Sequence, residues 1–260
     1  MLLELVKHRR TVWLLAARNI QDRYTGTLGG IVWAILNPLL LLLVYWVVFD
    51  VGLRFGSTSG DPFVLVLFCG LIPWMAFNEA LTGAAASITG RAYLVKKIAF
   101  PLEVLPATHL VAALLTHGIL IVILLLILLA YGRVPGMGLL LAPYYAACLV
   151  ALAAGLSYLM AAVTVFYRDV SQGLNVLLNV WFWVTPIVWP PDLVSGRLKP
   201  LLLFNPLNYV VSGYRDAFLA HSFVVPTPGP TLYFWTVVLL LWGLGAFVFT
   251  KLKPAFADVL

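Results

Sequence analysis

The chain has 260 residues, of which 63% are hydrophobic and only 10% are charged, and its mean hydropathy is +1.02. This composition leaves too little polar surface to cover a soluble globule, so it excludes a soluble domain and indicates an integral membrane protein. We assign the net charge of +6 to topology and contact with anionic lipid, which leaves nucleic-acid binding as the poorer explanation.

The first predicted element is a helix at about residues 10–26, ahead of any apolar run. Trp13 and Tyr24 belong to an apolar set that recurs at three- and four-residue steps, while Arg18 and Asp22 stand four apart on another face, followed by Arg23. The pattern is typical of an amphipathic helix at the membrane interface. It acts either as a simple anchor or as a rigid bracket that shares the cytoplasmic surface with a partner.

Six charge-poor apolar runs follow, each long enough to cross a hydrocarbon core of about 30 Å at about 1.5 Å per residue. They cover residues 31–49, 63–88, 105–131, 139–167, 170–189 and 232–250. The first run starts late and is long enough to span, so we expect no cleaved signal peptide. The sequence therefore predicts one all-α transmembrane domain over residues 1–260, with six membrane-spanning helices.

The distribution of basic residues predicts the orientation of these spans. With the amino terminus inside, the cytoplasmic segments hold eleven of the sixteen lysines and arginines, and the other side keeps five. We therefore expect both termini in the cytoplasm.

Residues that could carry chemistry are sparse. No glycine precedes a lysine, so a phosphate-binding loop is absent, and the two cysteines, Cys69 and Cys148, lie in apolar runs where neither a disulfide nor a metal site is expected. Glu79, His109 and His117 are the ionisable residues within spans. Glu79 requires a partner or water, and a place near a helix end or one structural hydrogen bond fits it better than a proton relay. The histidines fit packing or hydrogen bonding better than a metal site.

The cytoplasmic connection at about residues 89–102 interleaves apolar and basic side chains ahead of a proline. A short amphipathic helix from Arg91 to Phe100, lying on the membrane face, could transmit movement of a docked partner. The residues expected to couple are Arg91, Tyr93, Leu94, Lys96, Lys97, Ile98 and Phe100. The alternative is a loop that only contacts lipid headgroups.

Polar side chains in the fifth span recur at helical spacing, which places them on one face toward other helices or a water-filled path. Amides beside aromatic rings also suit a sugar, whose hydroxyls form hydrogen bonds while its faces stack on rings. The channel candidates are Trp33, Asn37, Tyr45, Asn175, Asn179, Trp181 and Phe182. The competing explanation, an aromatic belt at the membrane interface, is favoured for Trp33.

The outer segment at about residues 190–230 is too long for a simple turn and contains apolar patches. It predicts short re-entrant helices before the last span, which would form an outer gate.

Three motifs in the chain resemble the transmembrane subunits of ATP-binding-cassette type 2 polysaccharide exporters, the family of O-antigen, teichoic acid and capsule export. They are Arg23-Tyr24-Thr25-Gly26-Thr27-Leu28-Gly29, Tyr167-Arg168-Asp169-Val170, and Asn205-Pro206-Leu207 with Gly213-Tyr214-Arg215-Asp216-Ala217-Phe218. The segment from Lys97-Ile98 to Pro106 is similar to the coupling loop of that family.

The resemblance implies a homodimer with a channel between protomers, docked on two copies of a cytosolic ATPase. ATP and Mg would bind in those partner subunits, this chain would carry no cofactor or metal, and it would not be an enzyme. The exported substrate would be a lipid-linked glycan, crossing the bacterial inner membrane. A type 2 exporter of drugs or lipids is the alternative, and a membrane-embedded enzyme on lipid-linked sugars lacks the acidic or histidine cluster that it would need.

Overall fold

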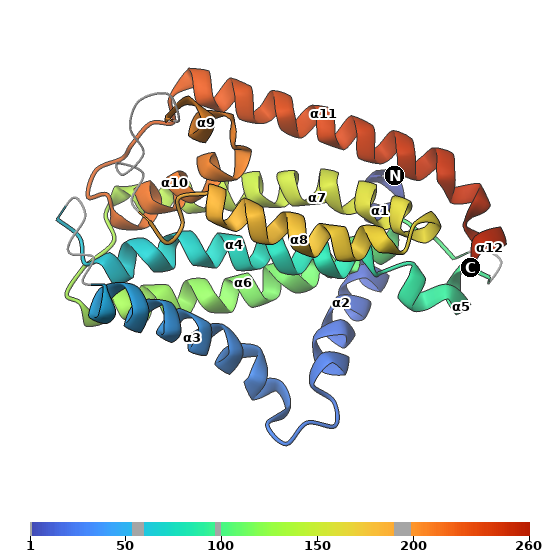
Figure 1. Ribbon diagram of the computed structural model, residues 1–260, viewed down its shortest axis with the longest axis horizontal. Helices are drawn as coiled ribbons and strands as arrows, with labels where there is room; N and C mark the ends of the chain where they lie inside the picture. Colours follow the sequence, from blue (N-terminus) through green and yellow to red (C-terminus); the bar gives the residue numbers. More distant parts are fainter. Residues whose placement is uncertain (1, 54–59, 97–99, 190–198) are drawn as a thin grey trace.

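The computed structural model describes residues 2–53, 60–96, 100–189 and 199–260, and within these ranges the regular structure is helical. The long helices run side by side in an elongated bundle (Figure 1). α4 (Phe63–Ala85) lies at its centre and packs against α6 (Val104–Ala130), α7 (Ala142–Phe166) and α10 (Pro206–Leu219). The core therefore consists mainly of leucine, alanine and aromatic side chains from these four helices.

Close helix contacts in the bundle depend on two glycine positions. A Cβ on Gly213 of α10 would lie 2.0 Å from the ring of Tyr145 of α7. A Cβ on Gly245 of α11 (Pro228–Leu252) would lie 2.4 Å from the carbonyl oxygen of Gly155 of α7. Small residues at these crossings let the backbones approach, as is common where apolar helices pack in a membrane.

Three helices cover the periphery: α3 (Trp33–Trp46), α8 (Asp169–Val184) and α11. α3 continues into the π-helical turn η2 (Val47–Gly52). Several leucines of both α3 and α11 are exposed, which is the pattern of a lipid-facing surface.

Five of the six predicted spans are confirmed as apolar helices long enough to cross a membrane. They are Trp33–Gly52, Phe63–Ala85, Val104–Ala130, Met137–Phe166, which begins with the 3₁₀ turn η4 (Met137–Leu141), and Pro228–Val259, which ends in η7 (Lys253–Ala255) and α12 (Phe256–Val259). The fifth predicted span is shorter than expected, because α8 ends at Val184. Pro186 accounts for this end: the residue before a proline is driven out of the helical region, and Thr185 has φ −89° and ψ 133°.

The predicted interfacial helix is α2 (Arg9–Tyr24), which follows the short α1 (Leu2–Lys7). α2 runs away from the bundle and α3 runs back to it, so that the two helices form a V whose tip is the loop between them (Figure 1). The side chain of Tyr24 lies outside the described residues.

α2 packs against the bundle through the face that holds its small residues. Val12, Ala16 and Asn19 are buried and pack against α6, whereas Trp13 is 54% exposed. Small residues of α2 thus contact α6, and Trp13 lies on the accessible side of the helix. Arg18 and Asp22 form an exposed ion pair of 3.6 Å on another face, as their spacing predicted.

Candidate functional site

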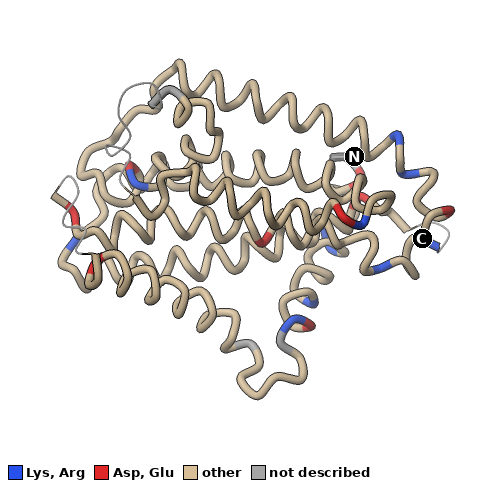
Figure 2. Tube along the Cα trace, in the orientation of Figure 1, with Lys and Arg blue, Asp and Glu red and all other residues tan. Residues whose placement is uncertain are grey.

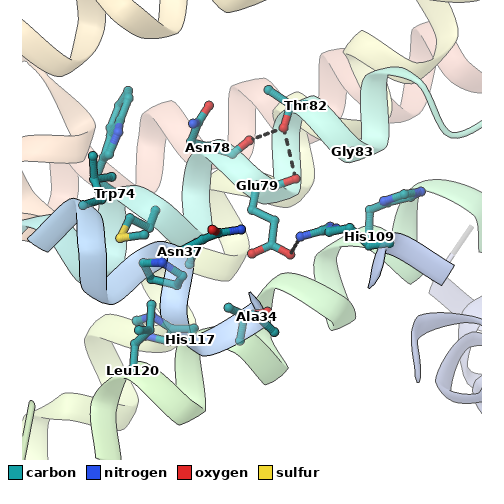
Figure 3. A pocket seen from close by; sticks show the side chains of 16 residues that line it. Ala34, Asn37, Trp74, Asn78, Glu79, Thr82, Gly83, His109, His117 and Leu120 are labelled. Carbon is teal, nitrogen blue, oxygen red and sulfur yellow. Dashed lines mark hydrogen bonds and ion pairs between the residues drawn. The ribbon is translucent and has the colours of Figure 1, made fainter. Parts of the chain in front are cut away.

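A pocket of about 580 Å³, lined by both apolar and polar side chains, lies between α3, α4 and α6, next to the end of α2. Figure 3 shows Asn37 of α3 and Glu79 of α4 pointing toward each other across this space. The other polar residues that line it are Arg23, Asn78, Thr82, His109, Thr116 and His117. The fold thus gathers polar side chains from separate apolar runs into one place.

Glu79 has the partner that the sequence required. Its Oε1 accepts a hydrogen bond of 2.8 Å from Nη1 of Arg23, and the Glu79 side chain is only 17% exposed. An unpaired charge in a membrane costs on the order of 3 kcal/mol on insertion scales, and the ion pair offsets part of that cost. The pair also ties the end of α2 to the bundle.

The two histidines on α6 occupy different environments. Nε2 of His117 lies 2.7 Å from the hydroxyl of Tyr214 on α10, and His117 is buried. His109 lies against Gly83, where a Cβ would come within 2.5 Å of its Nδ1. Within the described ranges, no group of three His, Cys, Asp or Glu residues is placed to hold a metal ion. Both side chains therefore have positions that suit packing and, for His117, hydrogen bonding.

The channel candidates of α8 separate into two groups. Asn175 and Asn179 are exposed on the side of α8 that faces away from the bundle. Phe182 is 6% exposed and packs on the Trp74 ring, with a centroid distance of 5.3 Å, and on the Tyr45 ring at 5.8 Å. Phe182 and Tyr45 thus have packing partners within the chain.

Trp181 also has a partner within the chain. Its Nε1 donates a hydrogen bond of 2.8 Å to Oδ1 of Asn205, and Nδ2 of Asn205 donates one of 2.8 Å to the hydroxyl of Thr185. The same Oδ1 caps α10 by accepting from the amide of Leu207. These bonds fix the end of α8 against the start of α10. Of the other two α3 candidates besides Tyr45, Trp33 is half-buried and Asn37 lines the pocket.

The outer segment contains α9 (Lys199–Phe204) and α10, and its residues 190–198 lie outside the described part. α10 packs on α4 and α7. The guanidinium of Arg215 donates to the carbonyl oxygens of Val66 at 3.3 Å, Pro186 at 2.8 Å and Ile187 at 3.0 Å. Arg215 therefore satisfies backbone groups that the break after α8 leaves without helical partners.

The described part of the predicted coupling segment contains a short helix. A 3₁₀ turn, η3 (Thr89–Arg91), leads into the four-residue α5 (Ala92–Val95), and Lys97 and Ile98 lie outside the described residues. Tyr93 is 63% exposed and Lys96 is exposed, whereas Leu94 and Phe100 are partly buried against the core. Part of the segment is thus anchored and part is accessible.

Arg91 connects this segment to α2. Its Nη2 donates a hydrogen bond to Oδ1 of Asn19, and Nδ2 of Asn19 donates one of 3.1 Å to the hydroxyl of Thr108 on α6. Asn19 is buried. One amide therefore joins the predicted coupling segment, the predicted interfacial helix and the bundle.

A second link at this end joins α6 to the carboxyl-terminal helix. Nζ of Lys253 lies 2.6 Å from Oε1 of Glu103. The hydroxyl of Tyr158 on α7 donates a hydrogen bond of 2.9 Å to the carbonyl oxygen of Glu103. Burial alone would raise the pKa of Glu103, but the hydrogen bond from Lys253 and its positive charge outweigh burial and hold the pKa below its usual 4.5. Glu103 is therefore charged at neutral pH.

Several residues of these networks were not predicted. Trp74, Asn78 and Thr82 stand four apart on α4, and a search for polar residues at helical spacing within each span would have indicated this stripe. Asn205 before Pro206 is a typical helix start, which the local sequence also contains. The ion pair of Glu103 with Lys253 joins residues 150 positions apart, and no local pattern indicates it.

The chain is similar to known membrane proteins over most of its length. A family model described as ABC-2 type transporter matches residues 10–219. The O-antigen export system permease protein RfbA of Myxococcus xanthus is 30% identical over 258 residues, which cover 98% of this chain and 97% of the relative.

Two further relatives are more distant. An O-antigen export system permease protein RfbA of Klebsiella pneumoniae is 26% identical over 252 residues, 95% of this chain and 93% of that protein. A polysialic acid transport protein KpsM of Escherichia coli is 25% identical over 241 residues, 91% of this chain and 92% of that protein.

Proposed function

Because this chain belongs to the ABC-2 type transporter family, we propose that it is the membrane-spanning permease subunit of an ATP-driven polysaccharide exporter. The observation that carries the proposal is the near full-length similarity to permeases named for O-antigen export and polysialic acid transport. The substrate is then a lipid-linked glycan resembling O-antigen, which leaves the cytoplasm across the bacterial inner membrane.

The energy comes from a separate ATPase, which binds ATP and Mg in two copies under the permease. The segment around α5 is the proposed contact for this subunit, through the exposed Tyr93 and Lys96 together with Lys97. Arg91 supports this role because its hydrogen bond to Asn19 offers a mechanical connection to α2.

The proposed orientation places both termini in the cytoplasm. Figure 2 shows many lysines and arginines at the end of the bundle where α5 and α12 lie, and few charged residues along its middle. The carboxyl terminus lies at this same end, which the positive-inside rule assigns to the cytoplasm. The end that contains α9 and α10 would then face outward, where these helices serve as the outer gate.

The proposed sixth crossing is α8. Its 16 residues extend about 24 Å at 1.5 Å per residue, and the following residues 185–189 extend the crossing further. The exposed amides of Asn175 and Asn179 would lack hydrogen-bond partners in lipid. We therefore place this face toward a second copy of the chain, so that a homodimer forms the channel.

The direct test is glycan export in cells that lack this gene. If the proposal is right, the surface glycan disappears, glycan accumulates inside, and the intact protein restores export. Restoration should fail when the partner ATPase carries a substitution that abolishes hydrolysis. A normal glycan surface in the deletion strain, with no second exporter present, would instead favour a drug or lipid exporter.

The contact with the ATPase has its own test. Tyr93→Ala combined with Lys96→Glu should reduce co-purification of the ATPase while leaving the membrane abundance of the permease unchanged. Lys7→Glu on α1 is the matched control, because it changes an exposed basic residue outside the α5 segment. Equal co-purification of both variants would count against docking at α5.

A further inference from the structure

We infer that the pocket between α3, α4 and α6 is a binding site for a neutral sugar unit of the exported glycan, an assignment that rests on the proposed function. All of its lining residues come from one copy of the chain, from α2, α3, α4 and α6, and none belongs to the exposed amide face of α8. Its volume of about 580 Å³ lies within the usual range for small-molecule sites, about 300–1,000 Å³.

The pocket lining offers the groups that recognise a sugar. Each sugar hydroxyl both donates and accepts hydrogen bonds, and the amide of Asn37 can do the same. Within the described part of the chain, the Asn37 amide has no hydrogen-bond partner, and Figure 3 shows it directed toward Glu79. The Glu79 carboxylate accepts and the Arg23 guanidinium donates.

An aromatic surface lies beside these polar groups. Trp74 lines the pocket and is held by Phe182 at 5.3 Å and by Phe77 at 6.1 Å between ring centroids. A rigid indole next to amide and carboxylate groups matches the two kinds of surface on a sugar ring, its C–H face and its hydroxyls.

The charges in the pocket favour a neutral ligand. Arg23 and Glu79 are opposite charges 2.8 Å apart, so the pair offers no net attraction to a diphosphate. A lipid chain is also a poor occupant, because it would cover Asn37, Arg23 and Glu79 without forming hydrogen bonds. A hydroxylated, uncharged group satisfies all three.

The two ends of the pocket differ in the residues that line them. Arg23, Gly83 and His109 lie toward the end of α2, while Leu41 and Leu120 lie further into the apolar part of the bundle. On α4 the lining extends from Trp74 to Gly83, which is about 14 Å at 1.5 Å per residue. A ligand would therefore enter from the α2 end, the cytoplasmic side in the proposed orientation.

The first experiment fills the pocket from α6, away from α8. Thr116 lines the pocket, and its hydroxyl bonds only to the carbonyl oxygen of Ala112 in its own helix among the described residues. Thr116→Phe should lower the initial rate of glycan export about tenfold at equal membrane abundance, since the new ring and a sugar cannot share the space. Ile119→Phe, on the same helix at a 43% exposed position, is the matched control and should export at the normal rate. Equal export by the two variants would overturn the assignment.

The second experiment detects the ligand directly and does not depend on a bulky side chain. A small diazirine-bearing amino acid replaces Thr116 or the 61% exposed Leu126 of α6 in exporting cells, and adducts are probed with antiserum to the surface glycan. Glycan adducts at position 116 and none at 126 support the site. Adducts at 116 that contain phospholipid alone, or glycan adducts only at a probe at Asn179, overturn it while the permease proposal stands. If the intact protein fails to restore export in the deletion strain, the proposed function itself is wrong.

Discussion

The central helix α4 and the peripheral helix α8 satisfy their polar side chains in different ways. In α4, 78% of the most apolar 18-residue window is buried, and Glu79 is paired with Arg23 inside the chain. In α8, Leu174, Leu178 and Phe182 form the buried face, while Asn175 and Asn179 remain on the exposed one. Glu79 of α4 therefore contributes to the stability of the chain itself, whereas the amides of α8 remain available for contacts that the chain alone does not provide.

The largest expected effect on stability belongs to Arg215, which holds the end of α8 against α4 and α10. Arg215→Met removes a charged donor from three backbone carbonyl oxygens and should lower the free energy of unfolding by about 3 kcal/mol. Titration with a denaturing detergent in mixed micelles measures the free energy of unfolding of the native protein and of the variant. A loss below about 1 kcal/mol would show that water replaces the guanidinium.

Breaking the ion pair between Arg23 of α2 and Glu79 of α4 should have the next largest effect on stability. Arg23→Ala leaves a largely buried carboxylate without its partner, and we expect a loss of about 2 kcal/mol in the same titration. Arg18→Ala is the control, because its ion pair with Asp22 is solvent-exposed and should contribute about 0.5 kcal/mol or less. If the two variants lose equal stability, Glu79 finds another partner or water.

The link between Glu103 and Lys253 should make stability depend on pH. The pKa of Glu103 is lowered in the folded protein, so its contribution is present above the usual pKa of 4.5 and is lost as the pH falls below that value. Lys253→Met should cost about 1 kcal/mol at pH 7, a modest value because the Lys253 side chain is 37% exposed.

The same variant should also flatten the decline of stability below pH 4.5. The measurement compares the unfolding midpoints of the native protein and the Lys253→Met variant at pH 7 and at pH 4. An equally steep decline in the variant would assign the pH dependence to other carboxylates.

The smallest effect is expected on the exposed face of α8. The combined variant Asn175→Leu with Asn179→Leu should change the free energy of unfolding of the isolated protein by less than about 0.5 kcal/mol, because neither amide has a partner within the described residues. A large loss would show that these amides stabilise the protomer, and the contrast with α4 would disappear.

Much of the fold could be predicted because each helix is long and apolar. Hydropathy alone identifies five of the six predicted spans, and Pro186 explains why the helix in the remaining one, the fifth in chain order, ends at Val184. The faces of the helices were harder to predict. Trp13 lies on the predicted apolar face and is exposed, whereas Ala16 is buried, because only one side of α2 contacts α6.

The candidate site was only partly predictable for a related reason. Asn37 was expected at a polar path and lines the pocket, and Glu79 was expected to need a partner. That this partner is Arg23, 56 residues earlier, depends on how α2 docks, which no local spacing encodes. Phe182 belongs to the predicted stripe of the α8 amides and Trp181 lies beside it, yet both rings contact residues outside α8.

The most direct test of the account is the rate of glycan export by the Asn175→Leu and Asn179→Leu double variant in cells that lack the native gene. The account predicts normal membrane abundance and an export rate reduced about tenfold or more, because an apolar face would replace the hydrogen-bonding one on the path of the glycan. The control is Val122→Leu with Leu126→Met on the exposed side of α6, which should export normally. Normal export by the α8 variant would contradict the claim that this face forms the pathway.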